Sequence, residues 1–152
     1  MVSVQLVPIR LEDEEQFTAM AISNFRDLNS AFVPHDDWKQ HYFSGVQGNP
    51  DLHLEWIRQD GKNAGFILYG VESHRFLPRK SGAIYELYIT PESRRLGLAR
   101  VAAAEAIRVL RQQSLSKIHI DVVEGNVSAA ELWQSLGFQK AAERYVLAGD
   151  AR

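Results

Sequence analysis

The chain contains no cysteine. This absence excludes disulfide bonds, catalysis by a cysteine thiolate, and zinc or iron–sulfur sites with cysteine ligands. It also suits a reducing compartment, in which disulfides are rare, so we expect a cytoplasmic location. The fold must instead be held together by its apolar core, which a chain of 152 residues is long enough to bury.

Long apolar runs and an excess of one charge are also missing. No stretch approaches the roughly 20 apolar residues that a membrane-spanning helix needs, and the N-terminus lacks the basic and then apolar order of a signal peptide. The sum of Lys and Arg is 17 and that of Asp and Glu is 19, a net charge of −2, whereas a nucleic-acid-binding domain usually has a strong basic excess. We therefore expect one domain over residues 1–152 with no membrane or nucleic-acid partner.

The pattern of apolar and polar residues predicts alternating strands and helices. Strands are predicted where β-branched residues alternate or cluster, and helices where apolar residues recur every three or four positions. In chain order, we predict a strand over 2–9, helices over 11–24 and from 36 or 37 to 43, a loop over 45–50, strands over 52–58, 64–71 and 83–90, a helix over 97–113, a strand over 117–123, a helix over 126–136 and a last strand over 138–147.

These elements predict a mixed α/β fold. Asp60-Gly61 is a strong hairpin signal, so the second and third strands are expected to be antiparallel. The strand–helix–strand unit over 83–123 predicts a right-handed crossover between parallel strands. The fold class is therefore a mixed, partly antiparallel sheet with helices on both faces.

The connection from Thr90 to the helix at Gly97 has the chemistry of an anion site. The first turn of a helix has unpaired backbone N–H groups and the positive end of the helix dipole. Gly97 and Ala99 allow close approach to the backbone, and three arginines add positive charge: Arg94, Arg95 and Arg100. The segment predicts a phosphate-binding turn, with an ordinary helix start as the alternative. It is neither a P-loop nor a dinucleotide fingerprint, because both spacings are absent.

Four segments resemble the GNAT superfamily of N-acetyltransferases. Arg94-x-x-Gly97-x-Ala99 is similar to the family's Q/R-x-x-G-x-G/A pyrophosphate loop, and Glu86-Leu87-Tyr88-Ile89-x-Pro91 resembles the strand before it. Asn126-x-x-Ala129-x-x-Leu132-Trp133-x-x-Leu136-Gly137-Phe138 is similar to the family's N-x-x-A-x-x-L-Y-x-x-L-G-F helix, and residues 61–66 resemble its earlier hairpin. The order of elements matches over nearly the whole chain. The resemblance implies a GNAT-like sheet with a splay between the fourth and fifth strands.

The resemblance implies that acetyl-CoA is the cosubstrate. The residues themselves show no strong metal site, so we expect no metal. The loop backbone would hold the pyrophosphate, the preceding strand would pair with the pantetheine arm, and an asparagine would lie near the pantetheine or acetyl end. The residues implied to bind the cofactor are Leu87, Tyr88, Ile89, Arg94, Arg95, Leu96, Gly97, Leu98, Ala99, Arg100 and Asn126. For Asn126, capping of the next helix is an equally strong interpretation, and both can be true.

The implied reaction is direct attack by a primary amine of a small molecule or peptide on acetyl-CoA in a ternary complex. An alkylammonium has a pKa of about 10 and must lose a proton before it attacks, so a carboxylate in the cleft helps. Glu86 is our candidate for this catalytic base, and a strand carboxylate paired with an arginine is the alternative. Strand alternation puts Glu86 and Tyr88 on one face and Tyr85, Leu87 and Ile89 on the other, a register that a bulge would spoil. A backbone N–H of this strand, freed by the splay, would stabilise the oxyanion.

Trp133 departs from the family pattern, because many members have there a tyrosine that protonates the departing thiolate. Three consequences stay open. First, the CoA thiol, with a pKa of about 8.5, can leave without a general acid. Second, Tyr145 or Tyr88 can serve as the general acid in place of that tyrosine. Third, the chain can be a non-catalytic acyl-CoA-binding module. Packing within the apolar stripe of its helix is the default interpretation of Trp133.

The region before the second strand holds further candidates. Early helices wall the acceptor site in this family, so its aromatic residues are expected to line a substrate pocket or to pack in the core: Phe32, Trp38, Tyr42 and Phe43. The same region has residue types that bind metals, but at poor spacing for one helical face. We interpret these as a polar loop and helix cap: His35, Asp36, Asp37 and His41.

One clear strand follows Phe138, where the family often has two. A missing strand leaves a sheet edge exposed, and an exposed edge invites pairing with a second chain. We therefore hypothesise a homodimer.

Overall fold

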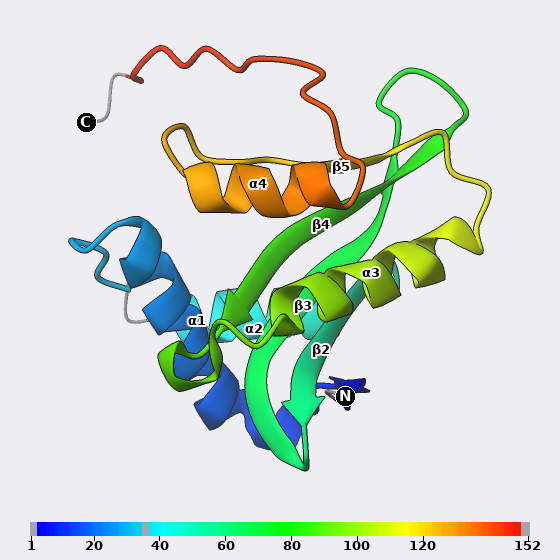
Figure 1. Ribbon diagram of the computed structural model, residues 1–152. Helices are drawn as coiled ribbons and strands as arrows, with labels where there is room; N and C mark the ends of the chain where they lie inside the picture. The colour runs from blue at the N-terminus through cyan, green and yellow to red at the C-terminus, as the bar shows by residue number, and fades with distance from the viewer. Residues whose placement is uncertain (1–2, 35–36, 150–152) are drawn as a thin grey trace. The chain divides into compact units, whose positions relative to one another are not determined.

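The computed structural model describes residues 3–34 and 37–149, and the chain divides into two compact units, residues 1–121 and 122–152. The first unit contains one sheet with the strand order β1-β2-β3-β4-β5 (Figure 1). Its elements are β1 (Val4–Pro8), the short 3-10 helix η1 (Leu11–Asp13), α1 (Glu14–Leu28), α2 (Trp38–Gln47), β2 (Leu52–Gln59), β3 (Lys62–Ser73), β4 (Lys80–Ile89), the 3-10 helix η2 (Pro91–Ser93), α3 (Leu98–Arg111) and β5 (Ile118–Ile120). The second unit contains α4 (Val127–Ser135).

The sheet is mixed, as the sequence predicts. β1 to β4 are antiparallel neighbours, and β4 pairs with β5 in parallel. The turn between β2 and β3 consists of Asp60 and Gly61, both with positive φ, 49° and 77°. Two left-handed residues match the twist of a two-residue hairpin, so the Asp-Gly prediction is confirmed.

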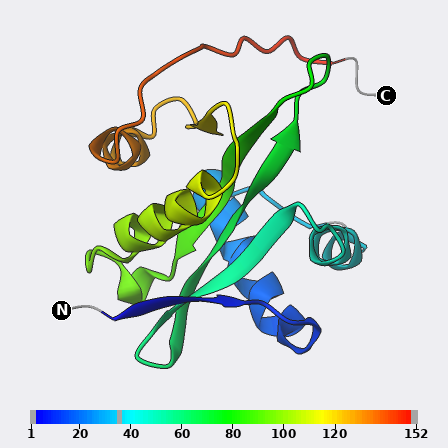
Figure 2. The same ribbon diagram turned by 90° about the vertical axis from the view of Figure 1, so that its right-hand side faces the viewer.

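Helices cover both faces of the sheet. α1 and α2 lie on one face and α3 on the other (Figure 2). The core under α1 and α2 consists of Ile9, Phe17, Ala21, Phe43, Leu54, Trp56, Phe66, Leu68 and Tyr88. The buried side of α3 consists of Leu98, Ala102, Ala103, Ala106, Ile107 and Leu110, which confirms the stripe that the helical period predicts.

A bulge in β4 decides which face its side chains occupy. Leu68 of β3 pairs with Glu86, but the next residue, Tyr69, pairs with Ile84, so Tyr85 is an extra residue in β4. An extra residue reverses the alternation of side chains beyond it. Glu86 therefore lies with Tyr88 on the α1–α2 face, and Tyr85 is exposed, with its hydroxyl donating to Glu72 Oε1 at 2.7 Å.

The sheet is splayed between β4 and β5. The pairing of β4 with β5 ends at Ile84, opposite Ile120, whereas the pairing of β4 with β3 continues to Ile89. Beyond Ile84, β4 thus has a partner strand on one edge only. This is the GNAT-like splay that the resemblance implies.

One predicted strand is absent, and the predicted bounds of β5 and α2 are wrong. The predicted strand 138–147 does not form: among the residues described here, 139–149 share no backbone hydrogen bond with another segment, and a strand exists only through pairing. β5 is three residues long rather than 117–123. The second helix continues to Gln47, into the predicted loop, because Val46, beyond Ser44 and Gly45, packs against the same core as Phe43.

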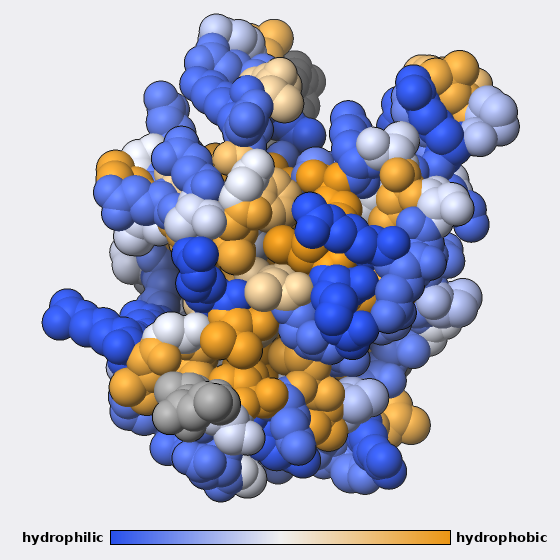
Figure 3. Space-filling view, turned by 45° about the vertical axis from the view of Figure 1, so that its right-hand side comes forward, coloured by the Kyte–Doolittle hydropathy of each residue, from blue (hydrophilic) through white to orange (hydrophobic). Residues whose placement is uncertain are grey.

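The tip of the β3–β4 hairpin, residues 74–79, exposes apolar side chains. Phe76 is 82% exposed and Leu77 45%, and apolar side chains stand at the end of the projection at the upper right of Figure 3. His74 Nδ1 accepts the backbone N–H groups of Phe76 at 3.0 Å and Leu77 at 2.9 Å. Because Nδ1 acts as an acceptor, this tip conformation requires a neutral imidazole protonated on Nε2. Along the described stretches of the chain, no helix is long and apolar enough to cross a membrane.

The contact of β3 with β4 at Gly65 leaves no room for a side chain. A Cβ at Gly65 would lie 1.9 Å from the Tyr88 carbonyl oxygen. We expect Gly65→Ala to lower the free energy of unfolding by about 3 kcal/mol, because the strands must separate to admit the methyl group.

The matched control is Gly45→Ala, since Gly45 lies within α2 and a Cβ there meets no atom within 4 Å. This change should raise the free energy of unfolding by about 0.5–1 kcal/mol, because alanine loses less entropy in a helix. Urea unfolding of both variants measures the difference. Equal stability of the two variants would show that β3 and β4 do not approach as closely as described.

Candidate active site

The connection between β4 and α3 is built from left-handed residues and one buried anchor. Arg95 and Gly97 have φ values of 67° and 78°, and the next residue, Leu98, is buried. A Cβ at Gly97 would meet no atom within 4 Å, so the turn faces open space. The buried leucine holds the start of α3 while the preceding backbone stays accessible.

This turn presents a row of backbone donors. Within the described residues, the N–H groups of five consecutive residues donate to no acceptor: Arg95, Leu96, Gly97, Leu98 and Ala99. The first N–H bond of the helix is that of Val101, to the Gly97 carbonyl at 3.2 Å. Unpaired N–H groups at the positive end of a helix bind anions such as phosphate. Five of the predicted residues, 95–99, thus form a cradle of backbone donors whose chemistry suits a diphosphate.

The side chain of Arg94 is engaged within the first unit. Its Nε donates to the Ile89 carbonyl at 2.8 Å, and its Nη2 donates to Asp27 Oδ2, also at 2.8 Å. The guanidinium lies 5.6 Å from the ring centroid of Tyr88. Arg94 therefore ties the end of β4 to α1, and the cradle is formed by main chain rather than by this side chain.

The open edge of β4 exposes alternate backbone groups. Thr90 N–H donates to the Ala64 carbonyl of β3 at 2.8 Å, and successive residues of a strand direct their groups to opposite edges. By this alternation Tyr88 directs its backbone to β3, while Leu87 and Ile89 direct theirs to the splay. The Ile89 carbonyl already accepts a hydrogen bond from Arg94. The groups of β4 that remain available for a ligand in the splay are therefore the N–H groups of Leu87 and Ile89 and the carbonyl of Leu87.

Glu86 lies on the face of the sheet that α1 covers. Its Oε2 accepts a hydrogen bond from Asn24 Nδ2 at 2.8 Å. Burial raises the pKa of the Glu86 carboxyl above its usual value, and the hydrogen bond from Asn24 lowers it in part. A carboxylate with a raised pKa is a better proton acceptor at neutral pH. The alternative interpretation, pairing with an arginine, is wrong, because the hydrogen-bond partner is an amide.

Aromatic rings surround Tyr42 on the same side. Tyr42 stacks on Phe17 and Trp38, with ring centroids 5.9 Å and 5.2 Å away, and meets Phe25 edge-on at 5.8 Å. Its hydroxyl is buried and has no hydrogen-bond partner among the described residues. Burial raises the pKa of Tyr42, and the nearby charge of Glu86 raises it further. Phe43 lies in the core, whereas Trp38 and Tyr42 are only partly buried.

The second unit contains the remaining predicted residues. Asn126 Oδ1 accepts the N–H of Ala129 at 3.2 Å, so its capping interpretation is confirmed, while its contact with a cofactor stays a prediction. Trp133 is buried and meets Phe138 edge-on at 5.5 Å. Tyr145 is exposed and donates its hydroxyl to Glu143 Oε2 at 2.9 Å.

No group of three potential metal ligands gathers in the part of the chain that the structure describes. His35 and Asp36 lie outside the described residues, and the other two members of that segment, Asp37 and His41, form an exposed i,i+4 pair at 3.5 Å. Such a pair is common at the start of a helix and does not indicate a metal site. The candidate active site is therefore the splay beside β4.

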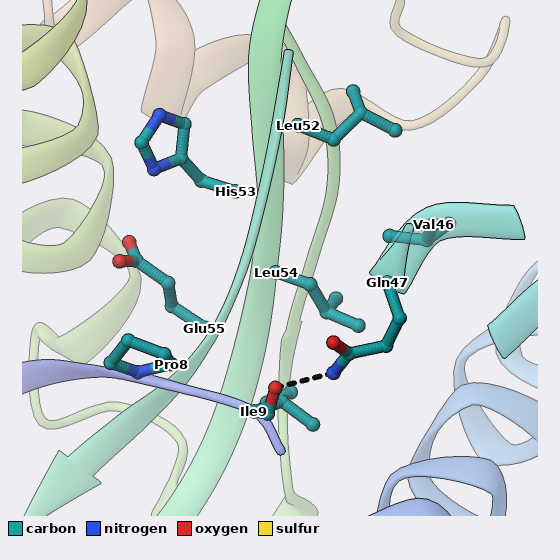
Figure 4. A pocket seen from close by; sticks show the side chains of 8 residues that line it. All are labelled: Pro8, Ile9, Val46, Gln47, Leu52, His53, Leu54 and Glu55. Carbon is teal, nitrogen blue, oxygen red and sulfur yellow. Dashed lines mark hydrogen bonds between the residues drawn. The ribbon is translucent and has the colours of Figure 1, made fainter. Parts of the chain in front are cut away.

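A cavity of about 180 Å³ lies at the ends of β1 and α2 and the start of β2. Leu52 and Leu54 point to one side of β2 and His53 and Glu55 to the other (Figure 4). On the first side, Gln47 donates to the Ile9 carbonyl. Because its polar groups do not converge, and because no predicted site residue lines it, this cavity is not the candidate active site.

Sequence reasoning missed two residues of α1, Asn24 and Asp27. Asn24 is 8% exposed, and it continues the stripe of Phe17 and Ala21 at spacings of four and three. A polar residue on an apolar stripe was therefore the available signal. Asp27 had no such signal, because its partner Arg94 is 67 residues away.

Comparison with known proteins gives one consistent family. The model of the acetyltransferase (GNAT) family matches residues 14–138. The ribosomal protein bS18-alanine N-acetyltransferase of Escherichia coli K12 is 26% identical over 107 residues, which cover 70% of this chain and 68% of that protein. The mycothiol acetyltransferase of Acidothermus cellulolyticus is 32% identical over 98 residues, 64% of this chain and 29% of that protein. The solved structure of aminoglycoside N-acetyltransferase AAC(6')-Iy with CoA has a TM-score of 0.77 at 14% identity, covering 99% of this chain and 97% of that one. This last likeness concerns the fold alone.

The raised pKa of Glu86 makes stability depend on pH. The folded state favours the protonated carboxyl, so its contribution to stability is complete below the ordinary value of 4.5 and is lost as pH rises through the folded pKa. Glu86→Gln stays neutral and still accepts from Asn24. We therefore expect its melting temperature to match that of the parent protein in acid and to exceed it increasingly towards neutral pH.

Glu105→Gln is the control, because the pKa of Glu105 is shifted in the opposite direction. The hydrogen bond from Arg108 lowers the pKa of Glu105, so that pair stabilises the protein above the ordinary value and not in acid. Its removal should therefore lower the melting temperature slightly at neutral pH only. Melting curves from pH 4 to 8 measure both trends, and a Glu86→Gln difference that is flat with pH would contradict the raised pKa of this half-buried carboxyl.

Proposed function

We propose that this chain, which belongs to the acetyltransferase (GNAT) family, moves an acetyl group from acetyl-CoA to a primary amine of a small molecule or peptide. Family membership makes it an acyltransferase, and the family uses acetyl-CoA. The proposal extends this to direct attack by the amine in a ternary complex, with Glu86 as the catalytic base.

The observation that carries the proposal is the junction of two features at the end of β4. The open edge of β4 leads directly into the turn whose five N–H groups lack acceptors among the described residues. The first feature suits an extended amide-containing arm, and the second suits a diphosphate. Coenzyme A contains both groups in this order, so the residues fit it.

Each residue then has a defined task. The backbone of residues 95–99 holds the diphosphate, and the N–H groups of Leu87 and Ile89 are donors for the pantetheine amides or for the thioester oxygen. Bound acetyl-CoA supplies an acyl carbon that an amine attacks. Glu86 accepts the proton of the incoming ammonium, which an amine with a pKa of about 10 carries at neutral pH.

The relatives support an amine acceptor. The name of the Escherichia coli relative specifies N-acetyltransfer to an alanine of a ribosomal protein, and the name of the Acidothermus cellulolyticus relative specifies mycothiol. These acceptors differ widely in size, and the rings of α1 and α2 beside Glu86 are where we place the acceptor of this chain. Fold alone does not choose between such acceptors.

We also propose that residues 1–152 act as a single domain, because the family match over 14–138 spans both units. The cytoplasmic location that we propose rests on the lack of cysteine. The homodimer stays a prediction. Its argument rests on the edge position of β5 in the sheet of the first unit, although a three-residue edge offers little backbone for pairing. Sedimentation at micromolar concentration distinguishes dimer from monomer.

The cradle predicts that Gly97→Ala weakens CoA binding. The methyl group would enter the open turn and displace the diphosphate from the N–H groups, so we expect calorimetry to show a Kd at least about tenfold higher. Gly61→Ala is the matched control, because Gly61 has nearly the same φ, 77°, and equally open surroundings.

Both variants should lose similar stability, about 1 kcal/mol, from the left-handed backbone. Only Gly97→Ala should lose CoA affinity. Equal CoA affinity of the two variants, or no binding of CoA by the parent protein, would refute the assignment of this turn.

Glu86→Gln tests the base. With acetyl-CoA and a panel of primary amines, release of free CoA should fall about 10²-fold near neutral pH. The deficit should shrink as pH approaches the pKa of the amine, where the acceptor no longer needs a base. Affinity for CoA should not change. Binding of CoA without turnover by the parent protein with any amine would instead favour the non-catalytic acyl-CoA-binding module.

A further inference from the structure

Glu86 is held by one oxygen only. Asn24 Nδ2 donates to Oε2 at 2.8 Å, and no described residue donates a hydrogen bond to Oε1. Asn24 comes from α1, is 8% exposed, and lies one helical turn before Asp27, which Arg94 binds at 2.8 Å. The amide is thus carried by a helix that is also tied, through Asp27 and Arg94, to the Ile89 carbonyl at the end of β4.

A second polar group lies on this face without a partner. The Tyr42 hydroxyl is buried and makes no hydrogen bond to any described residue. A buried hydroxyl without a partner costs free energy, so such a group calls for a water or a ligand atom. Its ring is fixed by stacking on Phe17 and Trp38, at 5.9 Å and 5.2 Å, which leaves the hydroxyl little freedom to turn elsewhere.

We propose that Asn24 and Tyr42 are positioning residues for Glu86: the Asn24 amide orients the carboxylate so that Oε1 faces the acceptor, and the Tyr42 hydroxyl holds the water or acceptor nitrogen from which Glu86 takes the proton. The proton moves from the acceptor's ammonium, directly or through that water, to Glu86, and no oxidant or reductant is involved. This inference rests on the proposed function and adds the residues that make Glu86 competent.

The charged and titratable groups around Glu86 are few. α1 contributes Asn24, which does not titrate, and α2 contributes Tyr42. β3 places Leu68 directly opposite, and β4 places Tyr88 on the same face, with the Arg94 guanidinium over its ring. The hydrogen bond from Asn24 favours the ionised carboxylate, so its loss has a defined direction.

The test uses the full chain with acetyl-CoA and the best amine of the panel. For Asn24→Ala we expect kcat/KM for the amine to fall about tenfold at neutral pH and the acidic limb of its pH profile to move to higher pH. Asn24→Asp, which keeps the shape of the side chain, should move that limb further, because two carboxylates then compete for ionisation. In a Glu86→Gln background, Asn24→Ala should cause no additional loss. The KM for acetyl-CoA should not change.

Tyr42→Phe tests whether the Tyr42 hydroxyl takes part in the reaction or whether the residue matters only through the packing of its ring. We expect a several-fold fall in kcat/KM for the amine with a melting temperature that is unchanged or higher, since the ring stays and an unpartnered hydroxyl is removed. Asn63→Ala is the control for loss of an asparagine side chain, because among the described residues the Asn63 side chain bonds Arg58 of β2 and Gln16 of α1 and not Glu86. It should leave both kcat/KM and the pH profile unchanged.

The outcomes separate this inference from the proposed function. If Glu86→Gln abolishes turnover but Asn24→Ala leaves the acidic limb in place, or Tyr42→Phe keeps full kcat/KM, the inference is overturned and the function stands. If the parent protein shows no turnover, the proposed function fails. In that case, titration of the Glu86 carboxyl carbon by NMR still tests whether Asn24 sets the ionisation of Glu86. A pKa of Glu86 that is unchanged in Asn24→Ala or Asn24→Asp overturns the role of Asn24.

Discussion

The extra residue Tyr85 in β4 is the constraint that decides which face of the sheet Glu86 occupies. Without it, strict alternation would put Glu86 on the same face as Ile84, which the register of β3 places opposite Tyr69. With it, Glu86 changes faces and meets Asn24 of α1. The bulge also occurs one residue after the pairing with β5 ends. The same short stretch of β4 thus opens one edge of the strand and turns a carboxylate towards the helices.

Helix α1 joins the two parts of the candidate site. Asn24 binds the carboxylate of Glu86, and Asp27, one turn later, binds Arg94 at the start of the connection between β4 and α3. Arg94 in turn holds the last carbonyl of β4, that of Ile89. The carboxylate and the donor row are therefore held at a defined separation by hydrogen bonds rather than by apolar packing alone. Since the Arg94–Asp27 pair is half-exposed, its share in stability is small and its main effect is on geometry.

Much of the site could be predicted because its signals are local. The Gly97 turn, the apolar stripe of α3, the Asp60-Gly61 hairpin and the Asn126 cap each depend on a few neighbouring residues, and each is found as predicted. The failures concern pairing between distant segments. Residues 138–147 have the composition of a strand, yet composition cannot provide the neighbouring strand that their backbone groups need.

The sequence by itself determined the family, the order of the elements, and the turn in which glycine and a helix start leave N–H groups accessible, because these follow from side-chain type and spacing along the chain. Only the tertiary structure decided that Glu86 faces α1, that an amide and not an arginine is its partner, and that Tyr42 has a buried hydroxyl without one. The physical reason is that a bulge and a hydrogen bond between α1 and β4 depend on the register and packing of segments about 60 residues apart, where no local preference acts.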